Sequence, residues 1–495
     1  MKIWKCFAVS LLISIPSFLE AQDANDALRY SDLTVGGTAR YMAMGGAFSA
    51  LGGDMSTLTT NPAGIGVFTR SQLTFSPGVS FQSTSAQYNG ITNMAEQASG
   101  NIQNAGLVLA WKNKREEAMW KGISFGIVFN RTNNFNTQLF IQGNNYNSTL
   151  LDQYTTQANG TPSGNLDQFY TGPAFNSGLL DTVKGGASYF NLIHPYLGNG
   201  VNYVTQQKSV STSGSMGETD FSFGGNYDNK LYVGATFGVP YVYYNENATY
   251  TETPSYTDTA YGLTSYNINS SVSTSGTGVN LKIGFIYLPV SWLRIGLAVH
   301  TPTVFYLSDQ YNTTFNANYN PSPYSSNGGP IQVQSPSGSF NYTLTTPMRV
   351  LGGLAFVIHK QAILSADYEY VDYSTASFSA PGTSYSAVNQ EIANSFMGAS
   401  NIRLGGEYVL YPFSIRLGYA FYGNSYAKIA DNTNLRRSLS GGVGVRIRHC
   451  FIDLAYVYSY YNTNYFLYSS PYGETPIAQN SNTMSDIVLT MGVNF

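Results

Sequence analysis

The residues that most often do chemistry in enzymes are few and scattered in this sequence. The four histidines are dispersed and show no metal-ligand spacing such as HExxH: His194, His300, His359 and His449. There is no phosphate-binding GxxxxGK[ST] loop, no GxSxG elbow with triad partners and no closely spaced cysteine pair. We therefore expect a protein that is not an enzyme and that has no cofactor and no metal site.

Two chemical alternatives stay open at this stage. A hydrolase built into a barrel could combine a serine, a histidine and a polar orienting group on neighbouring strands. His300 is the histidine to check for this role, because its place in the strand alternation points inward. His194, in a long loop, is the candidate for a haem role.

The charged side chains form a second set of candidate residues. They lie in segments where apolar and polar residues alternate. Charged side chains of both signs occupy the polar phase of these segments among Gly, Ala and Ser: Arg294, Arg349, Asp367, Glu369, Arg403, Glu407, Arg416 and Arg446. A secreted β-sandwich would also show alternation, but its polar phase would be the solvent surface and would carry more charged residues than these segments do. We expect these groups to face the lumen of a barrel and to pair there with one another and with whatever fills it.

The composition fits such a barrel. The chain has 495 residues, of which 10% are charged and 15% aromatic, with 40 Tyr and 28 Phe, yet its mean hydropathy is −0.13. Soluble domains carry about 25% charged residues. Strands that face lipid on one side and a wet lumen on the other produce this mixture. The net charge of −3 gives no reason to expect a nucleic-acid partner.

The N-terminus resembles an export signal. Lys2 and Lys5 precede an apolar run over 6–19, and Ala21 can end a cleaved signal peptide over residues 1–21. Removing it leaves Cys450 alone, so the mature chain cannot form an internal disulfide. No later segment is apolar for long enough to be a transmembrane helix.

The strands that would position the charged groups can be found by their alternation. The last one places Ile487, Leu489, Met491 and Val493 on one face and ends at Phe495, which resembles the assembly signal of bacterial outer-membrane barrels. Similar runs of roughly 9–12 residues recur, joined alternately by very short turns and long loops. We predict an all-β fold, a transmembrane antiparallel barrel of about fourteen strands over 71–495, with long extracellular loops at 144–217, 251–275 and 312–333. Ser76-Pro77-Gly78 predicts a bulge in the first strand.

The segment 22–70 does not have strand character. It is rich in small residues, and Pro62 restricts Asn61 to an extended or turn conformation. We interpret it as a plug inside the lumen. Seven of its residues form the candidate hatch motif: Gly45, Gly46, Asp54, Asn61, Pro62, Ala63 and Gly64. Met42, Met44, Phe48 and Leu51 are candidates for an apolar path, although packing against the barrel wall is the favoured role.

Three stretches carry a resemblance to a known family. They are "GGTARYMAMGGAFSALGGDMSTLTTNPAG" at 36–64, "GFIYLPVSWLRIGLAVHTPT" at 284–303 and "TPMRVLGGLAFVI" at 346–358. Together with the signal and the terminal strand, they resemble the FadL/TodX family of outer-membrane transport proteins for long-chain fatty acids and aromatic hydrocarbons. The resemblance implies a fourteen-stranded barrel with an N-terminal hatch containing Asn61, Pro62 and Ala63.

The resemblance also implies a function and partners. A hydrophobic small molecule would be captured by extracellular loops, enter an apolar lumen pocket and leave passively, in the best-known members sideways into the bilayer. The expected partners are that ligand, outer-membrane lipid and the barrel-assembly machinery, and the expected state is a monomer. Two alternatives remain, a surface adhesion or structural barrel with a closed lumen and a general diffusion porin.

Overall fold

The computed structural model describes residues 22–115, 117–183, 185–256, 262–320, 330–359, 361–472 and 475–495. The expected signal peptide at 1–21 lies outside the described residues. The helices are α1 (Ala24–Ser31), α2 (Ala39–Ala43), α3 (Thr57–Thr60), α4 (Leu150–Ala158), α5 (Thr171–Asn176) and α6 (Ser386–Ser395). The 3-10 helices are η1 (Pro62–Val67), η2 (Ser163–Asn165), η3 (His194–Tyr196), η4 (Tyr373–Thr375) and η5 (Lys428–Ala430).

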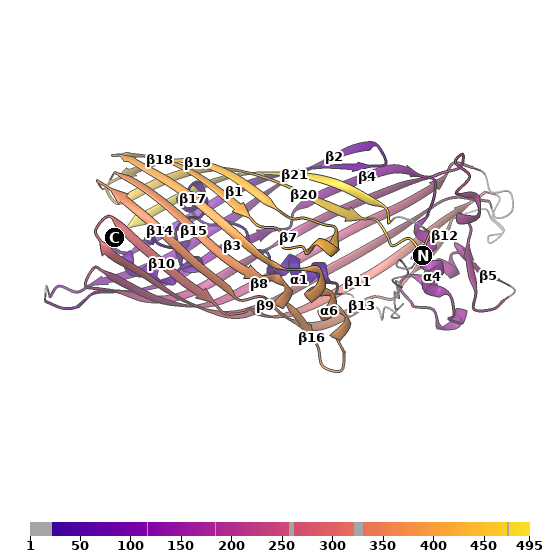
Figure 1. Cartoon of the computed structure of the whole chain (residues 1–495), viewed down its shortest axis with the longest axis horizontal. Helices are drawn as coiled ribbons and strands as arrows, with labels where there is room; N and C mark the ends of the chain where they lie inside the picture. The colour runs from indigo at the N-terminus through magenta and orange to yellow at the C-terminus, as the bar shows by residue number, and fades with distance from the viewer. Residues whose placement is uncertain are drawn as a thin grey trace, which may run out of the picture.

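Strands make up most of the molecule (Figure 1). The first half contains β1 (Gln72–Tyr88), β2 (Ile91–Lys112), β3 (Trp120–Asn134), β4 (Thr137–Asn145), β5 (Leu180–Thr182), β6 (Tyr189–Asn191), β7 (Val204–Tyr227), β8 (Leu231–Pro254), β9 (Leu263–Val290) and β10 (Leu293–His300). The second half contains β11 (Val304–Tyr319), β12 (Ile331–Gln334), β13 (Gly338–Thr345), β14 (Arg349–Ile358), β15 (Ala362–Asp372), β16 (Ser377–Ser379), β17 (Gly398–Leu410), β18 (Phe413–Tyr422), β19 (Arg436–Ile447), β20 (Cys450–Phe466) and β21 (Ile477–Asn494).

All strands except β5 and β6 belong to one antiparallel sheet that closes on itself. The strands pair in chain order around the ring, apart from those that continue a preceding strand, and β1 pairs with β21 from Gln72–Asn494 to Gln87–Gln479, which closes the ring. Because β4, β11, β12, β13 and β16 continue other strands across short breaks, the nineteen strands of this sheet form a fourteen-stranded barrel. The predicted fold is confirmed. The predicted bulge is also confirmed, since the β1–β2 register shifts between Ser76 and Pro77.

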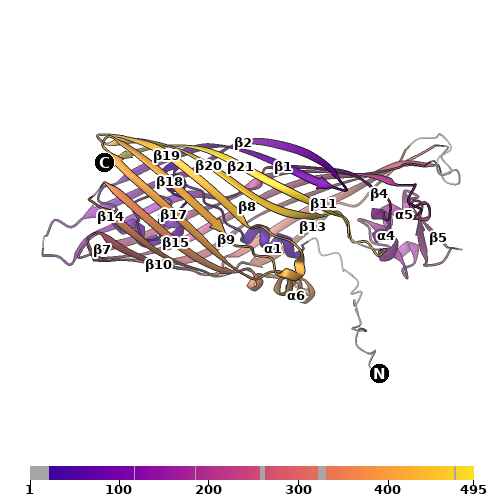
Figure 2. The same cartoon turned by 45° about the horizontal axis from the view of Figure 1, so that its top comes forward.

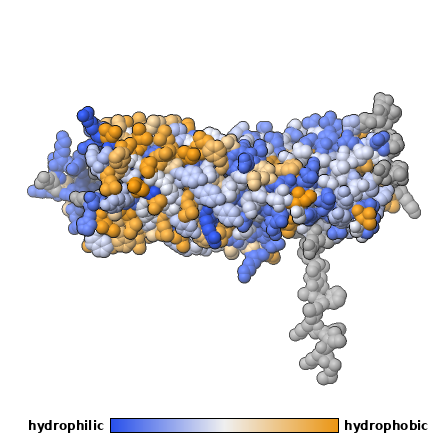
Figure 3. Space-filling view, turned by 90° about the horizontal axis from the view of Figure 1, so that it is seen from above, coloured by the Kyte–Doolittle hydropathy of each residue, from blue (hydrophilic) through white to orange (hydrophobic). Residues whose placement is uncertain are grey.

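An apolar band surrounds one part of the barrel. On β9 the exposed residues Leu281, Ile283, Phe285 and Tyr287 alternate with lumen-facing neighbours, and the same pattern repeats on the other strands. Apolar residues therefore gather over the end of the barrel that carries the short turns and the C-terminus, and the other part is mostly hydrophilic (Figure 3). We call these the turn end and the loop end. No helix among the described residues is long and apolar enough to cross a membrane.

The long loops are shorter than the sequence predicted. Five parts of the expected loops belong to strands: 204–217 to β7, 251–254 to β8, 263–275 to β9, 312–319 to β11 and 331–333 to β12. The prediction of loops was therefore wrong for these residues. These strand ends lie beyond the apolar band, where the outward face carries Ser, Thr and Asn in place of Leu and Ile. The hydropathy alternation that reveals strands inside the band is therefore absent there, although the strands continue (Figures 1 and 2).

A small subdomain occupies the loop end. Helices α4 and α5 and the hairpin β5–β6 share one hydrophobic cluster with the inner faces of β9 and β11, through residues such as Leu151, Tyr266 and Phe315. α4 begins with a capping box in which Thr149 and Asp152 bond each other's backbone N–H groups. His194 lies here, with Nδ1 3.1 Å from Asp152 and its ring stacked on Tyr472.

Candidate functional site: the plugged lumen

The N-terminal segment 22–71 lies inside the barrel, where its helices are visible between the strands (Figure 1). It bonds to strands all around the ring. Ala39 N donates to Thr490 on β21 at 2.7 Å, and Ser49 N donates to Asp367 on β15 at 2.7 Å. Further bonds reach Thr132 on β3 and Asp220 on β7, so the segment contacts strands on every side of the lumen.

Asn61 fixes the second half of this plug. Its side-chain Nδ2 donates to the Ser49 carbonyl at 2.6 Å and to the Phe285 carbonyl at 3.2 Å. Its Oδ1 accepts from Ala63 N at 3.1 Å, which caps η1, and Pro62 takes the first position of that helix. Asn61 is fully buried. One side chain thus joins two plug turns to strand β9.

A row of glycines in the wall receives this turn. Gly224, Gly234 and Gly284 lie side by side on β7, β8 and β9, paired in register and facing the lumen. A Cβ on Gly284 would collide with the Asn61 side chain, and one on Gly234 would lie 2.8 Å from the Ala63 nitrogen. The plug backbone therefore packs directly on the wall backbone. We call these three residues the glycine row.

The first half of the plug is seated in the same way on the other side of the ring. Gly405 and Gly418 are paired on β17 and β18, and a Cβ on Gly405 would lie 2.6 Å from the Met44 carbonyl oxygen. The chain turns at Gly45 and Gly46, with φ of +62° and +76°, values that favour glycine. The two predicted hatch glycines thus make the turn that lies against Gly418.

Asp54 accepts hydrogen bonds from other residues of the plug. Thr38 Oγ1 donates to its carboxylate at 2.8 Å, and Ser56 N donates to it at 3.0 Å. Thr38 also caps α2 by accepting from Tyr41 N. Asp54 therefore ties the beginning of α2 to the chain before α3. Gly64, the last predicted motif residue, packs on Thr57 and Gly52, where a Cβ has no room.

Two ion-pair networks join the plug to the wall or lie beside it. In the first, Glu407 accepts from plug residue Arg40 at 2.6 Å and from Arg416 at 2.8 Å, and Arg416 also bonds Asp453 at 2.6 Å. All four groups are largely buried. Pairing of this kind, with both charges hydrogen-bonded, is what a buried charge requires.

The second network centres on Glu369. Arg349 bonds it at 2.5 Å and Arg403 bonds its other oxygen, and Arg349 also donates to the backbone carbonyl of plug residue Ser31. Arg294 donates to the Leu51 carbonyl at 2.6 Å. The structure thus brings four of the eight sequence-predicted charges, Arg294, Arg349, Asp367 and Glu407, into direct contact with the plug, and Glu369, Arg403 and Arg416 pair with wall residues beside them. Arg446 differs, because it lies exposed at the turn end with its guanidinium 5.8 Å from the Phe451 ring centre.

A third cluster was missed by the sequence reasoning. Lys282 Nζ lies 2.6 Å from Glu218 and 3.0 Å from Asp220, and all three side chains are buried. Thr59 of the plug donates to Asp220 at 2.7 Å. The signal was present: two acidic residues two positions apart share one phase of β7, and Lys282 is in the lumen phase of β9.

The four candidate apolar-path residues are packed rather than open. Met42, Met44, Phe48 and Leu51 belong to a buried cluster with Ala455, Val457 and Val488 of the wall. Their exposed fractions are 0–3%. In this closed arrangement they fill space between the plug and the barrel.

Small cavities lie inside the lumen. Two of them, of about 40 and 50 Å³, share the lining residues Leu33, Thr132, His300 and Arg349. Such volumes hold water but no fatty acid. His300 itself is buried and donates from Nε2 to the Thr60 carbonyl at 2.8 Å, so it is a plug contact. These two cavities are therefore too small to be the apolar lumen pocket that the family resemblance implies.

The wall has a break in its hydrogen bonding between β2 and β3. β2 and β3 pair only up to Asn104 and Asn130, although β2 begins at Ile91 and β3 continues to Asn134. Beyond this point the plug takes the place of the missing strand, because Thr34 N donates to the Thr132 carbonyl at 2.9 Å. Nearer the loop end, Asn89 Nδ2 donates to the Asn144 carbonyl at 2.8 Å and closes that end of the break.

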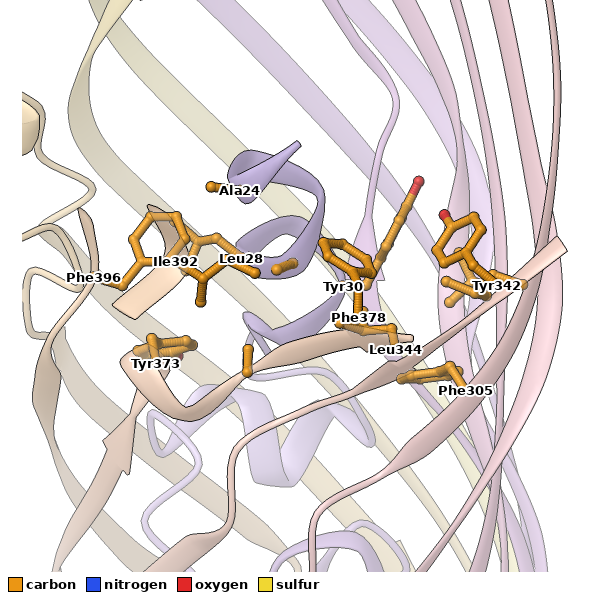
Figure 4. Packing of buried hydrophobic residues seen from close by; sticks show 14 of the residues in the cluster. Ala24, Leu28, Tyr30, Phe305, Tyr342, Leu344, Tyr373, Phe378, Ile392 and Phe396 are labelled. Atoms are coloured by element: carbon orange, nitrogen blue, oxygen red, sulfur yellow. The ribbon is translucent and has the colours of Figure 1, made fainter. Parts of the chain in front are cut away.

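The first helix covers the plug toward the loop end. Ala24, Leu28 and Tyr30 of α1 project into an apolar cluster with residues of β11, β13, η4 and α6 (Figure 4). Tyr385 Oη bonds Gln22, and Gln22 bonds Asp309 at 2.7 Å. This cluster joins α1 to the wall and to α6. At the other end of the chain, Phe495 lies exposed at the turn end, with its N–H donating to the Ser71 carbonyl.

No group of three or more His, Cys, Asp or Glu side chains within the described ranges is arranged to hold a metal ion. No protein-family model matches the sequence. No curated protein matches it either.

Solved structures do match the fold. A Pseudomonas aeruginosa FadL homologue aligns with a TM-score of 0.55 at 12% identity, covering 94% of this chain and 100% of that chain. The Pseudomonas putida toluene transporter TodX aligns with a TM-score of 0.52 at 14% identity, covering 93% of this chain and 99% of that one. The FadL/TodX resemblance predicted from the sequence is thus confirmed at the level of the fold, a closed fourteen-stranded barrel shared along almost the whole chain.

Proposed function

We propose that this protein is an outer-membrane channel through which hydrophobic compounds, such as long-chain fatty acids or aromatic hydrocarbons, pass without energy coupling. The shared fold, the apolar outer band and the plugged lumen support this proposal. The observation that carries it is the break between β2 and β3, which plug residue Thr34 closes by its bond to Thr132.

This break provides a sideways route. Leu33 of the plug and Thr132 of the wall line both small cavities of the lumen, and Thr34 bonds Thr132 beside them. If the plug segment 32–36 moves inward, the lumen opens toward the lipid between β2 and β3, because no ladder bond joins those strands there. An apolar ligand would then leave directly into the bilayer, where its transfer from water is favourable.

Entry begins at the opposite side of the plug. The apolar cluster around α1, which includes Tyr30, Phe305 and Leu344, lies toward the loop end, so a ligand arriving from outside would first reach the plug there. Binding there competes with the packing of α1. Displacement of α1 would pull on Ser31, its last residue, which directly precedes the segment 32–36 that covers the break.

A reversible tether tests the proposal. Thr34 and Thr132 are replaced by Cys in a Cys450→Ser background, and the pair is joined with a cleavable bifunctional thiol reagent. Uptake of labelled long-chain fatty acid and of toluene is measured in cells that have no other channel for them. We expect uptake to stop in the tethered protein and to return when the tether is cleaved.

The two single-cysteine variants, treated with the same reagent, are the matched controls and should keep full uptake. Heat-modifiable migration on gels checks that the barrel is folded in each case. Uptake that continues through the tethered protein would rule out the sideways route. A folded, untethered protein that takes up neither compound would overturn the channel function itself.

A further inference from the structure

A wide polar groove lies on the wall away from the lumen. It has a volume of about 690 Å³ and runs across β7, β8, β9, β11 and the beginning of β13. Nine of its fourteen lining residues are Ser, Asn or Gln, and the plug contributes none of them. Neither the channel nor its plug uses this groove.

The groove opens outward. Tyr243, one of its lining residues, is 51% exposed, whereas its neighbours Val242 and Tyr244 are buried in the barrel interior. On β11 the same alternation leaves Gln310 exposed and Asp309 buried. Because side chains alternate across a strand, the amides of Asn245 and Asn247 share the outer face with Tyr243.

Its height relative to the membrane follows from the neighbouring side chains. Phe237 and Val279 belong to the apolar band, and Tyr243 and Tyr306 lie just above them with half or more of their surfaces exposed, as girdle aromatics do. Asn245 and Asn247 follow Tyr243 by two and four positions on the way to the loop end, which is roughly 7 and 14 Å along the strand. The groove therefore begins where the hydrocarbon layer ends.

The amides in the groove are free. In the described parts of the chain, no hydrogen bond joins the side chains of Asn245, Asn247 or Gln310 to any other protein group. The next rows of the same face are different, because Thr249 bonds Asn269 and Asn316 bonds Asn267, both at 2.8 Å across strands. Each free amide offers two donors and an acceptor, the groups that sugar hydroxyls pair with.

The charge of the groove distinguishes between the neutral and the acidic groups that lie outside the hydrocarbon layer. Glu246 is the one charged residue among the described residues that line the groove, and it is acidic. A phosphate or an acidic sugar would find no cation there and one repelling carboxylate. Tyr243 adds a flat amphipathic surface of the kind that combines apolar contact with a polar edge.

We propose that this groove binds the neutral sugars of the lipopolysaccharide that surrounds the barrel. The proposal rests on the proposed function only in placing the barrel in an outer membrane. The lipid-anchored saccharide is favoured over a free glycan because the groove lies on the side wall, where it extends from the upper edge of the apolar band toward the loop end through Asn247 and Asn312.

The test compares two lipopolysaccharides as probes, one with its complete neutral saccharide and one truncated to the lipid and its acidic inner sugars. Purified detergent-solubilised protein is exchanged with each, and the retained molecules are counted by native mass spectrometry. We expect the wild type to retain the complete form about tenfold better. The double variant Tyr243→Ala/Asn245→Ala should lose that preference, as removal of a central aromatic contact commonly costs about tenfold or more.

Tyr460→Ala is the control, since Tyr460 is an outward-facing tyrosine of β20 that is 41% exposed and lies outside the groove. It should retain the wild-type preference. Equal retention of the two probes by the wild type would overturn the proposal. So would equally tight binding of the saccharide freed from its lipid, which would indicate an external glycan. The readout needs no transport, so a protein that binds the complete form yet takes up no hydrophobic compound would fail only the channel function.

Discussion

At the scale of single residues, the closed state depends on a few polar side chains whose loss cannot be compensated locally. Asn61 makes three hydrogen bonds that join two plug turns to β9. Lys282 pairs with two carboxylates in the barrel wall. Both are buried, so water cannot replace their bonds without entering the wall contact, and removing either leaves unpaired partners behind.

Replacing Asn61 by Ala should loosen the plug while the barrel stays folded. The lost bonds leave the Ser49 and Phe285 carbonyls unpaired, a cost of about 1–3 kcal/mol. We expect frequent open events in planar-bilayer conductance recordings, where the wild type is closed. Asn25→Ala is the control, because Asn25 is exposed and bonds only the neighbouring Asp23 among the described residues. Equally quiet traces from both variants would contradict this role of Asn61.

Replacing Lys282 by Met should destabilise the whole barrel. Glu218 and Asp220 would remain buried without their cation, which costs about 3–5 kcal/mol. The measurement is the free energy of unfolding in urea for protein folded into lipid vesicles. Lys230→Met provides the comparison, because Lys230 forms only an exposed pair with Asp228 at 3.4 Å and such pairs contribute about 1 kcal/mol or less. A similar small loss in both variants would show that the buried triad contributes little.

At the scale of elements, the plug fits inside the barrel because the strands have glycine at positions where the plug touches them. The glycine row, Gly224, Gly234 and Gly284, lets η1 approach three strands at backbone distance. The sequence shows these glycines in the lumen phase, but nothing in the sequence shows which plug turn faces them. That pairing depends on contacts between residues 160 or more positions apart, which local patterns do not encode.

Replacing Gly234 by Val should displace the Asn61–Ala63 turn. The new side chain would occupy the space of the Pro62 carbonyl and the Ala63 nitrogen, which are backbone atoms and cannot rotate away. We expect limited proteolysis to cut the plug of this variant while the barrel strands stay protected. Gly352→Val is matched to it, since a Cβ there has only Leu297 at 3.7 Å. Equal protection of the plug in both variants would argue against the glycine row as its seat.

At the scale of the whole molecule, alternation predicts the barrel well wherever the outward residues are apolar. Ile487 to Phe495 and the β9–β10 hairpin were found in this way. The strand ends at 204–217 and 263–275 were expected to be loops, because above the membrane both faces of a strand can be polar. The ion pairs of the lumen were expected from their shared phase, but their partners required the register of the sheet.

The position of the membrane gives a prediction at this scale. Ile283→Arg places a charge on the lipid face of β9 and should cost about 2–4 kcal/mol in the free energy of unfolding from vesicles. Asn269→Arg, on the same face of the same strand but fourteen positions nearer the loop end, should cost about 1 kcal/mol or less. Equal costs at the two positions would mean that the apolar band is not the level of the hydrocarbon.

The length of β9 has a consequence for how a ligand reaches the protein. Its 28 residues extend over about 95 Å, or roughly 65 Å along the barrel axis at a tilt of about 45°. A bilayer core covers about 25 Å of that height, so about 40 Å of wall stands outside it. In an outer membrane, the entrance is thus held at or above the sugars that repel apolar molecules. A hydrophobic compound can meet the protein in open water, and its passage through the saccharide layer takes place inside the barrel.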